Sequence, residues 1–437
     1  MPANLETIAT KNLVPSPRNA RTHDRKQLDQ IAASIRQFGF TNPVLIDEDN
    51  VVIAGHGRLQ AAKQIGLDEV PAIRVTHLSA PEKRTLMLAD NKIADNAGWD
   101  LDLLAIELAD LSEMELNFDI DVTGFETAEI DLIIGGSEPD GESDAEIAPV
   151  PDRDQPLITQ RGDLWFLGQH RVLCGDARKP SDYAALMDDE VADMGFTDPP
   201  YNVPISGHVC GNGRVQHREF AEAAGEMSPQ EFTCFLGEAL GLGAKHSRDG
   251  AVWYACIDWR HLPEMHVAGL QAFDAWLNLC VWAKTNAGLG SLYRSQHELI
   301  CVFRKGQGQH QNNVQLGKYG RNRTNLWSYP GVNTFRAGRM EELQAHPTPK
   351  PVAMIKDAIL DVTKRGDIVL DPFLGSGSTL IAAERCGRVT RGLEIDPAYV
   401  DVALRRWRDE TGKEPVRAND RRTLASLERE LTQEAGQ

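Results

Sequence analysis

The chain has 437 residues, of which 41% are hydrophobic and 25% charged, and its formal net charge at pH 7 is −18. A typical domain has about 100 to 200 residues, so this length predicts two or three domains, and we expect two. No apolar run approaches the ~20 residues of a membrane span, so the composition predicts a soluble globular protein. The net negative charge excludes a protein whose whole surface is basic and binds phosphate. Any contact with nucleic acid must therefore come from a local basic surface.

The start of the chain, MPANLETIATKNLVPSPRNAR, has no apolar signal core, which predicts a cytoplasmic protein. Seven cysteines are scattered without a C-x-x-C pair, so we expect no disulfide framework. His208, Cys210 and His217 are the nearest approach to a metal cluster, but no second Cys pair accompanies them. We therefore expect a structural or loop role there and no metal site.

A segment at 135–156 is rich in Gly, Ser and Pro and carries seven acids against the single Arg153. Such a composition is typical of an extended linker that repels itself. The sequence therefore predicts an N-terminal domain at 1–134, a linker at 135–156 and a C-terminal domain at 157–437.

The N-terminal domain is expected to be α+β. Apolar residues recur at helical spacing over Gln27–Phe38. Two β-branched runs, Val44–Ile46 and Val51–Ile53, are separated by turn-forming residues, which predicts a hairpin. A helix over Leu59–Ile65 and a strand over Val70–Val75 follow.

The turn before that helix is Gly55, His56, Gly57 and Arg58. A glycine turn at a helix N-terminus with an Arg beside it is a natural anion site. These residues resemble the N-terminal domain of the ParB and sulfiredoxin superfamily over about 5–99, which implies a phosphate or nucleotide site at these four positions. The domain has no Cys, which excludes sulfiredoxin chemistry, and Leu59 stands where partition-type ParB proteins show a second arginine. A purely structural or DNA-docking turn is the alternative.

The C-terminal domain alternates short apolar runs with helical stretches, which predicts an α/β fold with a doubly wound, mostly parallel sheet. The runs expected to be strands are Val191–Phe196, Ala251–Ile257, Leu277–Trp282, Leu299–Phe303, Ile368–Leu370 and Thr390–Ile395.

One glycine-rich turn, Asp371-Pro-Phe-Leu-Gly-Ser-Gly-Ser-Thr379, joins a predicted strand to a predicted helix. Glycines there allow backbone to approach a ligand at the carboxyl edge of the sheet. Glu394, nineteen residues after Gly375, is placed to accept hydrogen bonds from ribose hydroxyls. No Lys-[Ser/Thr] follows, which excludes a P-loop. The charge of Asp371 suits a cationic ligand such as an aminoacyl sulfonium, and a merely structural cap is the alternative.

A second motif, Asp198-Pro199-Pro200-Tyr201, follows an apolar strand. The prolines fix the backbone and remove N–H donors. The carboxylate of Asp198 and the carbonyl of Pro199 can then accept the two N–H bonds of an exocyclic amine, and Tyr201 offers a flat face for an extruded base. A proline-rich turn with a surface tyrosine is the alternative.

Together the two motifs resemble those of the DNA amino-methyltransferases over about 157–407, in the order of that family's beta group. The resemblance implies a Rossmann-like domain that binds S-adenosylmethionine. The stretch 346–351, HPTPKP, and the triplet Gly175-Asp176-Ala177 are similar to further segments of that family near the cofactor. The cofactor-binding residues that it implies are Asp176, Lys350, Asp371, Phe373, Gly375, Ser376, Gly377, Ser378 and Glu394, and the implied catalytic residues are Asp198, Pro199, Pro200 and Tyr201.

The family pattern also implies a target recognition region at about 304–345. The stretch 299–340 contains seven Lys or Arg and no acid, with Trp327 and Tyr329 among them, so it is the expected DNA-binding surface, and a solvated loop is the alternative. The loop after Tyr201 is expected to close over the flipped base. It contains His208, Arg214, His217 and Arg218.

The expected reaction is direct methyl transfer to N6 of adenine in DNA. None of the cysteines follows a proline, which excludes the nucleophile of ring-carbon cytosine methylation. Cytosine N4 is the nearest alternative, because that branch of the family usually shows Ser in place of Asp198. A non-enzymatic ParB-like partition or scaffold protein is the alternative from another class. Resemblance to the beta group also implies a possible homodimer.

Overall fold

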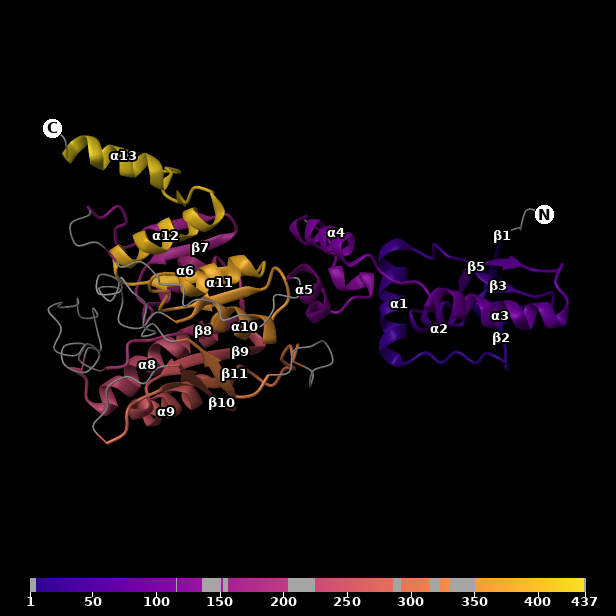
Figure 1. Ribbon diagram of the computed structural model, residues 1–437, viewed down its shortest axis with the longest axis horizontal. Helices are drawn as coiled ribbons and strands as arrows, with labels where there is room; N and C mark the ends of the chain where they lie inside the picture. The colour runs from indigo at the N-terminus through magenta and orange to yellow at the C-terminus, as the bar shows by residue number, and fades with distance from the viewer. Residues whose placement is uncertain are drawn as a thin grey trace. The chain divides into compact units, whose positions relative to one another are not determined.

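The computed structural model describes residues 5–114, 116–135, 151, 156–202, 225–285, 292–314, 323–330 and 350–435. The chain forms two compact units, Met1–Ser137 and Glu138–Gln437, drawn in Figure 1. The boundary between them lies inside the segment predicted to be a linker, most of which is outside the described residues.

The N-terminal unit is α+β, as predicted. Its five-stranded sheet has the order β1-β5-β3-β4-β2. The strands are β1 (Leu5–Ala9), β2 (Val14–Pro15), β3 (Val44–Ile46), β4 (Val51–Ala54) and β5 (Glu69–Arg74). The helices are α1 (Arg25–Phe38), α2 (His56–Gln64), α3 (Ala80–Asp95), α4 (Leu101–Glu113) and α5 (Thr127–Gly135), with 3-10 turns η1 (Thr10–Asn12) and η2 (Ile120–Thr123).

Local sequence accounts for the start of this unit. Asp24 caps α1 by accepting a hydrogen bond from the backbone N–H of Gln27 at 2.7 Å. Strands β3 and β4 pair antiparallel, which confirms the predicted hairpin. Its turn is closed by Asp47, whose carboxylate accepts the N–H of Val51 at 2.8 Å, while Asn50 takes a left-handed φ of 62°.

The C-terminal unit is built on a ten-stranded sheet of order β12-β10-β11-β9-β8-β13-β14-β7-β6-β15. The strands are β6 (Leu164–Leu167), β7 (His170–Cys174), β8 (Ala192–Thr197), β9 (Ser247–Ile257), β10 (Ala275–Lys284), β11 (His297–Arg304), β12 (Leu326–Tyr329), β13 (Ile368–Asp371), β14 (Val389–Glu394) and β15 (Val416–Arg417). The helices are α6 (Pro180–Met187), α8 (Pro229–Lys245), α9 (Leu262–Ala272), α10 (Val352–Val362), α11 (Ser378–Arg385), α12 (Pro397–Thr411) and α13 (Leu424–Ala435), with the 3-10 turn η3 (Trp259–His261).

The centre of this sheet is parallel. Strands β9, β8, β13, β14 and β7 run in one direction, and β11 and β6 flank them antiparallel. The predicted α/β class and the six predicted strands are confirmed. Strands β6, β7, β12 and β15 were not predicted from the sequence, and β12 lies within the stretch expected to contact DNA.

Helices cover both faces of the sheet. Side chains alternate along β9, so that Val252 and Tyr254 pack with α10, α11 and α12, whereas Trp253 and Ala255 pack with α6, α8 and α9. Figure 1 shows α8 and α9 side by side next to β11. Burial on both faces explains why these strands are continuous apolar runs.

No helix in the described part of the chain is long and apolar enough to cross a membrane. No disulfide joins the six cysteines of the described residues. Cys210 is outside the described residues.

Candidate active site

The two motifs meet at one edge of the sheet. Strand β13 lies between β8 and β14, and all three are parallel, so their carboxyl ends are neighbours. Asp198 directly follows β8, Asp371 ends β13 and Glu394 ends β14. In an open α/β sheet this edge is where ligands bind.

The glycine turn between β13 and α11 has the conformation that requires glycine. Gly375 and Gly377 have φ of 54° and 84°, in the left-handed region. A Cβ at Gly377 would lie 2.9 Å from the Cβ of Ala403, whereas one at Gly375 would meet open space. Backbone at Gly375 is therefore accessible to a ligand.

The carboxylate of Asp371 organises this turn. It accepts hydrogen bonds from the backbone N–H of Phe373 at 3.0 Å and from the hydroxyl of Thr379 at 2.6 Å. Asp371 therefore does act as a cap, which was the structural alternative for this residue. Burial raises its pKa to about 7 despite these hydrogen bonds.

Glu394 closes the turn from the neighbouring strand. Its carboxylate accepts the N–H of Gly375 at 2.8 Å and the N–H of Asp396 at 2.8 Å. Burial raises the pKa of Glu394 to about 7 as well. Two buried carboxylates of raised pKa at one sheet edge favour a ligand that brings a positive charge and hydroxyl donors.

The other residues expected at the cofactor surround this turn. Arg406 donates to the carbonyl of Ser376 at 3.3 Å and to the hydroxyl of Ser378 at 3.2 Å. Phe373 packs against Phe235, with ring centroids 5.8 Å apart. Asp176 follows β7, where the preceding Gly175 donates its N–H to the carbonyl of Glu394 at 3.0 Å. The donor set fits an aminoacyl sulfonium nucleoside such as S-adenosylmethionine.

Asp198 is held by two neighbours. Its Oδ1 accepts the hydroxyl proton of Tyr201 at 2.7 Å, and its Oδ2 lies 2.5 Å from Nζ of Lys350. Of the two prolines that separate Asp198 from Tyr201 in sequence, Pro199 is buried and Pro200 is half-buried. Burial raises the pKa of Asp198, with Glu298 adding to the rise and Lys350 opposing it.

Two residues of this cluster differ from the sequence expectations. Lys350 was expected among the cofactor ligands, and the structure places its ammonium between Asp198 and Glu298, 3.0 Å from Oε2 of Glu298. Glu298 was not singled out from the sequence at all. The available signal was an acid inside the apolar strand HELICVFR, a position where charged residues are rarely buried unless paired.

The basic stretch is only partly available to DNA. Arg323 forms ion pairs with Asp357 at 2.9 Å and Asp361 at 2.8 Å, and Trp327 is 5% exposed in the core. Tyr329 donates its hydroxyl proton to Asp357. Expecting Arg323 and Trp327 to face DNA was therefore wrong, because Arg323 is held by two acids of α10 and Trp327 is buried on β12. Four basic residues of the stretch lie outside the described residues, namely Lys318, Arg321, Arg336 and Arg339.

Other expected positions also lie outside the described residues. They are His208, Cys210, Arg214, His217 and Arg218 of the loop after Tyr201, and His346 to Pro349 before Lys350. Within the described ranges, no three His, Cys, Asp or Glu side chains are grouped to hold a metal ion.

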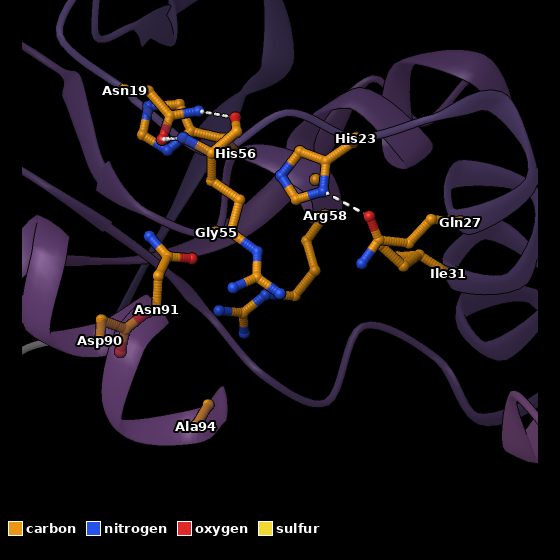
Figure 2. Close-up of a pocket in the computed structure, with 12 residues that line it drawn as sticks. Asn19, His23, Gln27, Ile31, Gly55, His56, Arg58, Asp90, Asn91 and Ala94 are labelled. Atoms are coloured by element: carbon orange, nitrogen blue, oxygen red, sulfur yellow. Dashed lines mark hydrogen bonds between the residues drawn. The ribbon is translucent and has the colours of Figure 1, made fainter. Parts of the chain in front are cut away.

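The turn predicted as an anion site in the N-terminal unit borders a cavity of about 220 Å3, shown in Figure 2. Gly55 has a left-handed φ of 94° and directly precedes α2 as its N-cap residue. Arg58 donates to the carbonyl of Asn42 at 2.6 Å, and burial lowers the pKa of its guanidinium. His56 accepts the backbone N–H of Ser16 at 3.2 Å.

Three family models match the chain. The DNA methylase model N6_N4_Mtase matches residues 192–405, the ParB N-terminal domain model matches 2–92, and the ParB-methyltransferase HTH domain model matches 102–161.

The part of the chain that the HTH model matches is acidic over its described helices. The stretch 100–135 carries eleven Asp or Glu and no Lys, Arg or His. The described helices α4 and α5 of the HTH match therefore offer no basic side chain to DNA phosphates.

Curated relatives match each part of the chain. The ParB-like nuclease domain-containing protein YnaK of Escherichia coli K12 is 49% identical over 74 residues, which is 17% of this chain and 85% of that protein. The Type II methyltransferase M2.DpnII of Streptococcus pneumoniae is 29% identical over 51% of this chain and 85% of its own length. M2.MboI of Moraxella bovis is 27% identical over 55% of this chain and 88% of its own length.

Among solved structures, the M1.HpyAVI–SAM complex has 20% sequence identity and a TM-score of 0.40, and the match covers 54% of this chain and 97% of that one. The family uses S-adenosylmethionine, and the residues at the glycine turn fit that cofactor. By its family matches, the chain carries a DNA methylase domain of the S-adenosylmethionine-dependent N6/N4 family together with a ParB N-terminal domain.

Proposed function

We propose that this DNA methyltransferase methylates N6 of adenine in a base flipped out of the helix. The observation that carries the proposal is the carboxylate of Asp198, held by Lys350 and Tyr201 beside the glycine turn. When bound, S-adenosylmethionine supplies an electrophilic methyl group on its sulfonium. The chain itself contributes position and exclusion of water.

Asp198 is the proposed acceptor for the amine. Each carboxylate oxygen has two lone pairs, so Asp198 can accept an amine N–H in addition to its present donors. With the carbonyl of Pro199 as second acceptor, the amine is oriented with its lone pair toward the methyl group. Tyr201 offers the base a ring face, and flipping costs a few kcal/mol that stacking and these hydrogen bonds offset.

Cytosine N4 presents the same chemistry to the same acceptors and is the second candidate. The identity of residue 198 favours adenine, because the cytosine branch of the family usually shows Ser at the matching position. A serine hydroxyl is neutral, whereas Asp198 is a carboxylate that stabilises the positive charge developing on the amine nitrogen.

The test is transfer of labelled methyl from S-adenosylmethionine to DNA, followed by nucleoside analysis of the digested product. N6-methyladenine is the expected product. If the product is N4-methylcytosine, the proposed roles of the two motifs stand, but the target base is cytosine and not adenine. Absence of incorporation into single- or double-stranded DNA of mixed sequence would contradict the proposal.

For the N-terminal unit, we propose a site for nucleotide or inorganic phosphate at Gly55 to Arg58. Three observations support it: a cavity of about 220 Å3, the start of α2 at Gly55, and a partly desolvated Arg58. Backbone N–H groups at a helix N-terminus and a guanidinium together favour an anion.

Arg58→Ala is expected to weaken binding of a nucleoside triphosphate by at least about tenfold, because a hydrogen bond to a charged group contributes about 1.5–3 kcal/mol. Calorimetric titration of the full chain with the four nucleoside triphosphates and with inorganic phosphate measures this. The matched control is Arg36→Ala, an exposed arginine on α1. Equal affinity in both variants would favour a structural turn.

A further inference from the structure

Beneath the proposed amine site lies a closed cluster of charged side chains. Glu298 on β11 and Lys350 before α10 have side chains only 7% and 3% exposed. Lys284 on β10 forms an ion pair with Oε1 of Glu298. The cluster therefore joins three segments distant in sequence to Asp198 after β8.

Asp198 and Glu298 share their donors. The hydroxyl of Tyr201 lies 2.7 Å from Oδ1 of Asp198 and 3.0 Å from Oε2 of Glu298. The ammonium of Lys350 lies 2.5 Å from Oδ2 of Asp198 and 3.0 Å from Oε2 of Glu298. Both groups that hold the carboxylate of Asp198 are thus themselves held by Glu298.

The charges in this cluster balance. Two carboxylates, Asp198 and Glu298, face two ammonium groups, Lys284 and Lys350. A buried charge without a partner is costly, so each member depends on the others. Burial alone would raise the pKa of Glu298, but Lys350 and Lys284 hold it at about 2, so Glu298 stays ionised at neutral pH.

The Tyr201 hydroxyl has a single proton and can donate it to only one carboxylate at a time. When it donates to Glu298, Oδ1 of Asp198 loses a competing donor, and both of its lone pairs are available to an amine N–H. Glu298 thus provides the alternative acceptor that frees Asp198 for substrate while the tyrosine ring stays in place.

We propose that Glu298 is a positioning residue for methyl transfer, which orients Asp198 through Lys350 and Tyr201 and receives the tyrosine hydrogen bond when the amine binds. The inference rests on the proposed function of Asp198 as amine acceptor. Glu298 itself is not expected to touch the base or the cofactor.

The decisive comparison is between Glu298→Gln, which keeps shape and removes charge, and Glu298→Asp, which keeps charge and shortens the side chain. For Glu298→Gln we expect kcat to fall about 10- to 100-fold, since small misplacements of reacting groups have effects of that size. The Kd for S-adenosylmethionine, measured by calorimetry, is expected to change less than about twofold. A twofold change corresponds to a difference in binding free energy of about 0.4 kcal/mol.

The pH profile of kcat distinguishes a role of Glu298 in positioning Asp198 from a role in folding alone. The charged and titratable groups facing Asp198 are Lys350, Glu298, Tyr201, Cys256 and Asp371. The charge of Glu298 raises the pKa of Asp198, so its removal lowers that pKa. The acid limb of kcat is therefore expected to move to lower pH in Glu298→Gln and to stay in place in Glu298→Asp, with kcat reduced in both.

The control is Glu384→Gln. Glu384 is a carboxylate in the same domain that accepts two side-chain hydrogen bonds, from His170 at 2.6 Å and Trp407 at 2.8 Å, but it contacts no residue of this cluster. Its kcat and acid limb are expected to match those of the unmodified enzyme. If Glu298→Gln misfolds and fails to bind S-adenosylmethionine, the kcat of Glu298→Asp tests the inference, and a reduced kcat is expected.

Full kcat and an unmoved acid limb in both Glu298 variants would overturn the inference while leaving the role of Asp198 intact. Retained activity in Asp198→Ala would instead remove the proposed function on which the inference rests. The two failures are therefore distinguishable.

Discussion

Replacement of Asp198 by Ala is expected to lower kcat for methyl transfer by at least about 10²-fold, the usual effect of removing one group that stabilises charge in a transition state. The carboxylate is the only acidic side chain of its motif, and it sits at the sheet edge beside the glycine turn. Cofactor affinity is expected to remain within about threefold, because Asp198 follows β8, whereas the glycine turn is organised by Asp371 and Glu394. Single-turnover methyl transfer and calorimetry measure the two effects separately.

Asp193→Asn is the matched control for this variant. Asp193 is on β8, the strand that Asp198 follows, and is paired with Arg248 at 2.7 Å, but it lies five residues before Asp198, roughly 16 Å along the chain direction. Its loss is expected to lower thermal stability and to leave kcat unchanged. A variant at Asp198 that keeps most of its kcat would contradict the proposed amine acceptor.

Affinity for S-adenosylmethionine is expected to fall as pH drops below 7. Asp371 and Glu394 have pKa values of about 7 because they are buried, and their ionised forms suit the sulfonium charge and the ribose hydroxyls. Protonation removes the favourable form, so each carboxylate weakens binding by about tenfold between pH 8 and pH 6. Calorimetric titration across this range measures the effect.

Glu394→Gln is expected to weaken binding at pH 8 and to flatten this pH dependence to that of Asp371 alone. Asp401→Asn is the control, since Asp401 is also a buried carboxylate that accepts two backbone N–H groups, from Ile158 and Thr159. It should keep the full pH dependence. An affinity that does not change between pH 8 and pH 6 would contradict the assignment of both carboxylates.

The raised pKa values also link the free protein's stability to pH. A carboxyl whose folded pKa lies above its unfolded value binds protons preferentially in the folded state. Asp371 and Glu394 therefore favour folding below about pH 4 and lose that contribution as pH rises through about 7.

Much of the architecture could be predicted because it is local. The hairpin of β3 and β4 is encoded by turn residues between two β-branched runs, and the buried strands β8, β9 and β11 read as continuous apolar runs. Short strands such as β12 and β15 carry too few residues for a periodic pattern, and they form because the sheet offers an edge to pair with.

The candidate site divides in the same way. Both motifs are contiguous in sequence, so Asp198 and Gly375 could be proposed from the motifs themselves and Glu394 from its spacing to Gly375. The neighbours of Asp198 could not, because Glu298 and Lys350 are 100 and 152 residues away in sequence. An ion pair of that separation exists only after β8, β11 and the start of α10 have been brought together.

By itself the sequence determined the fold class, the two motifs and the chemistry they suit, because turns, apolar periodicity and proline or glycine conformations act within a few residues. Tertiary structure alone decided that Lys350 faces Asp198, that Glu298 holds both Lys350 and Tyr201, and that Arg323 pairs with α10 while Trp327 is buried on β12. The physical reason is that buried charges must find partners wherever packing places them, and packing is a property of the whole chain.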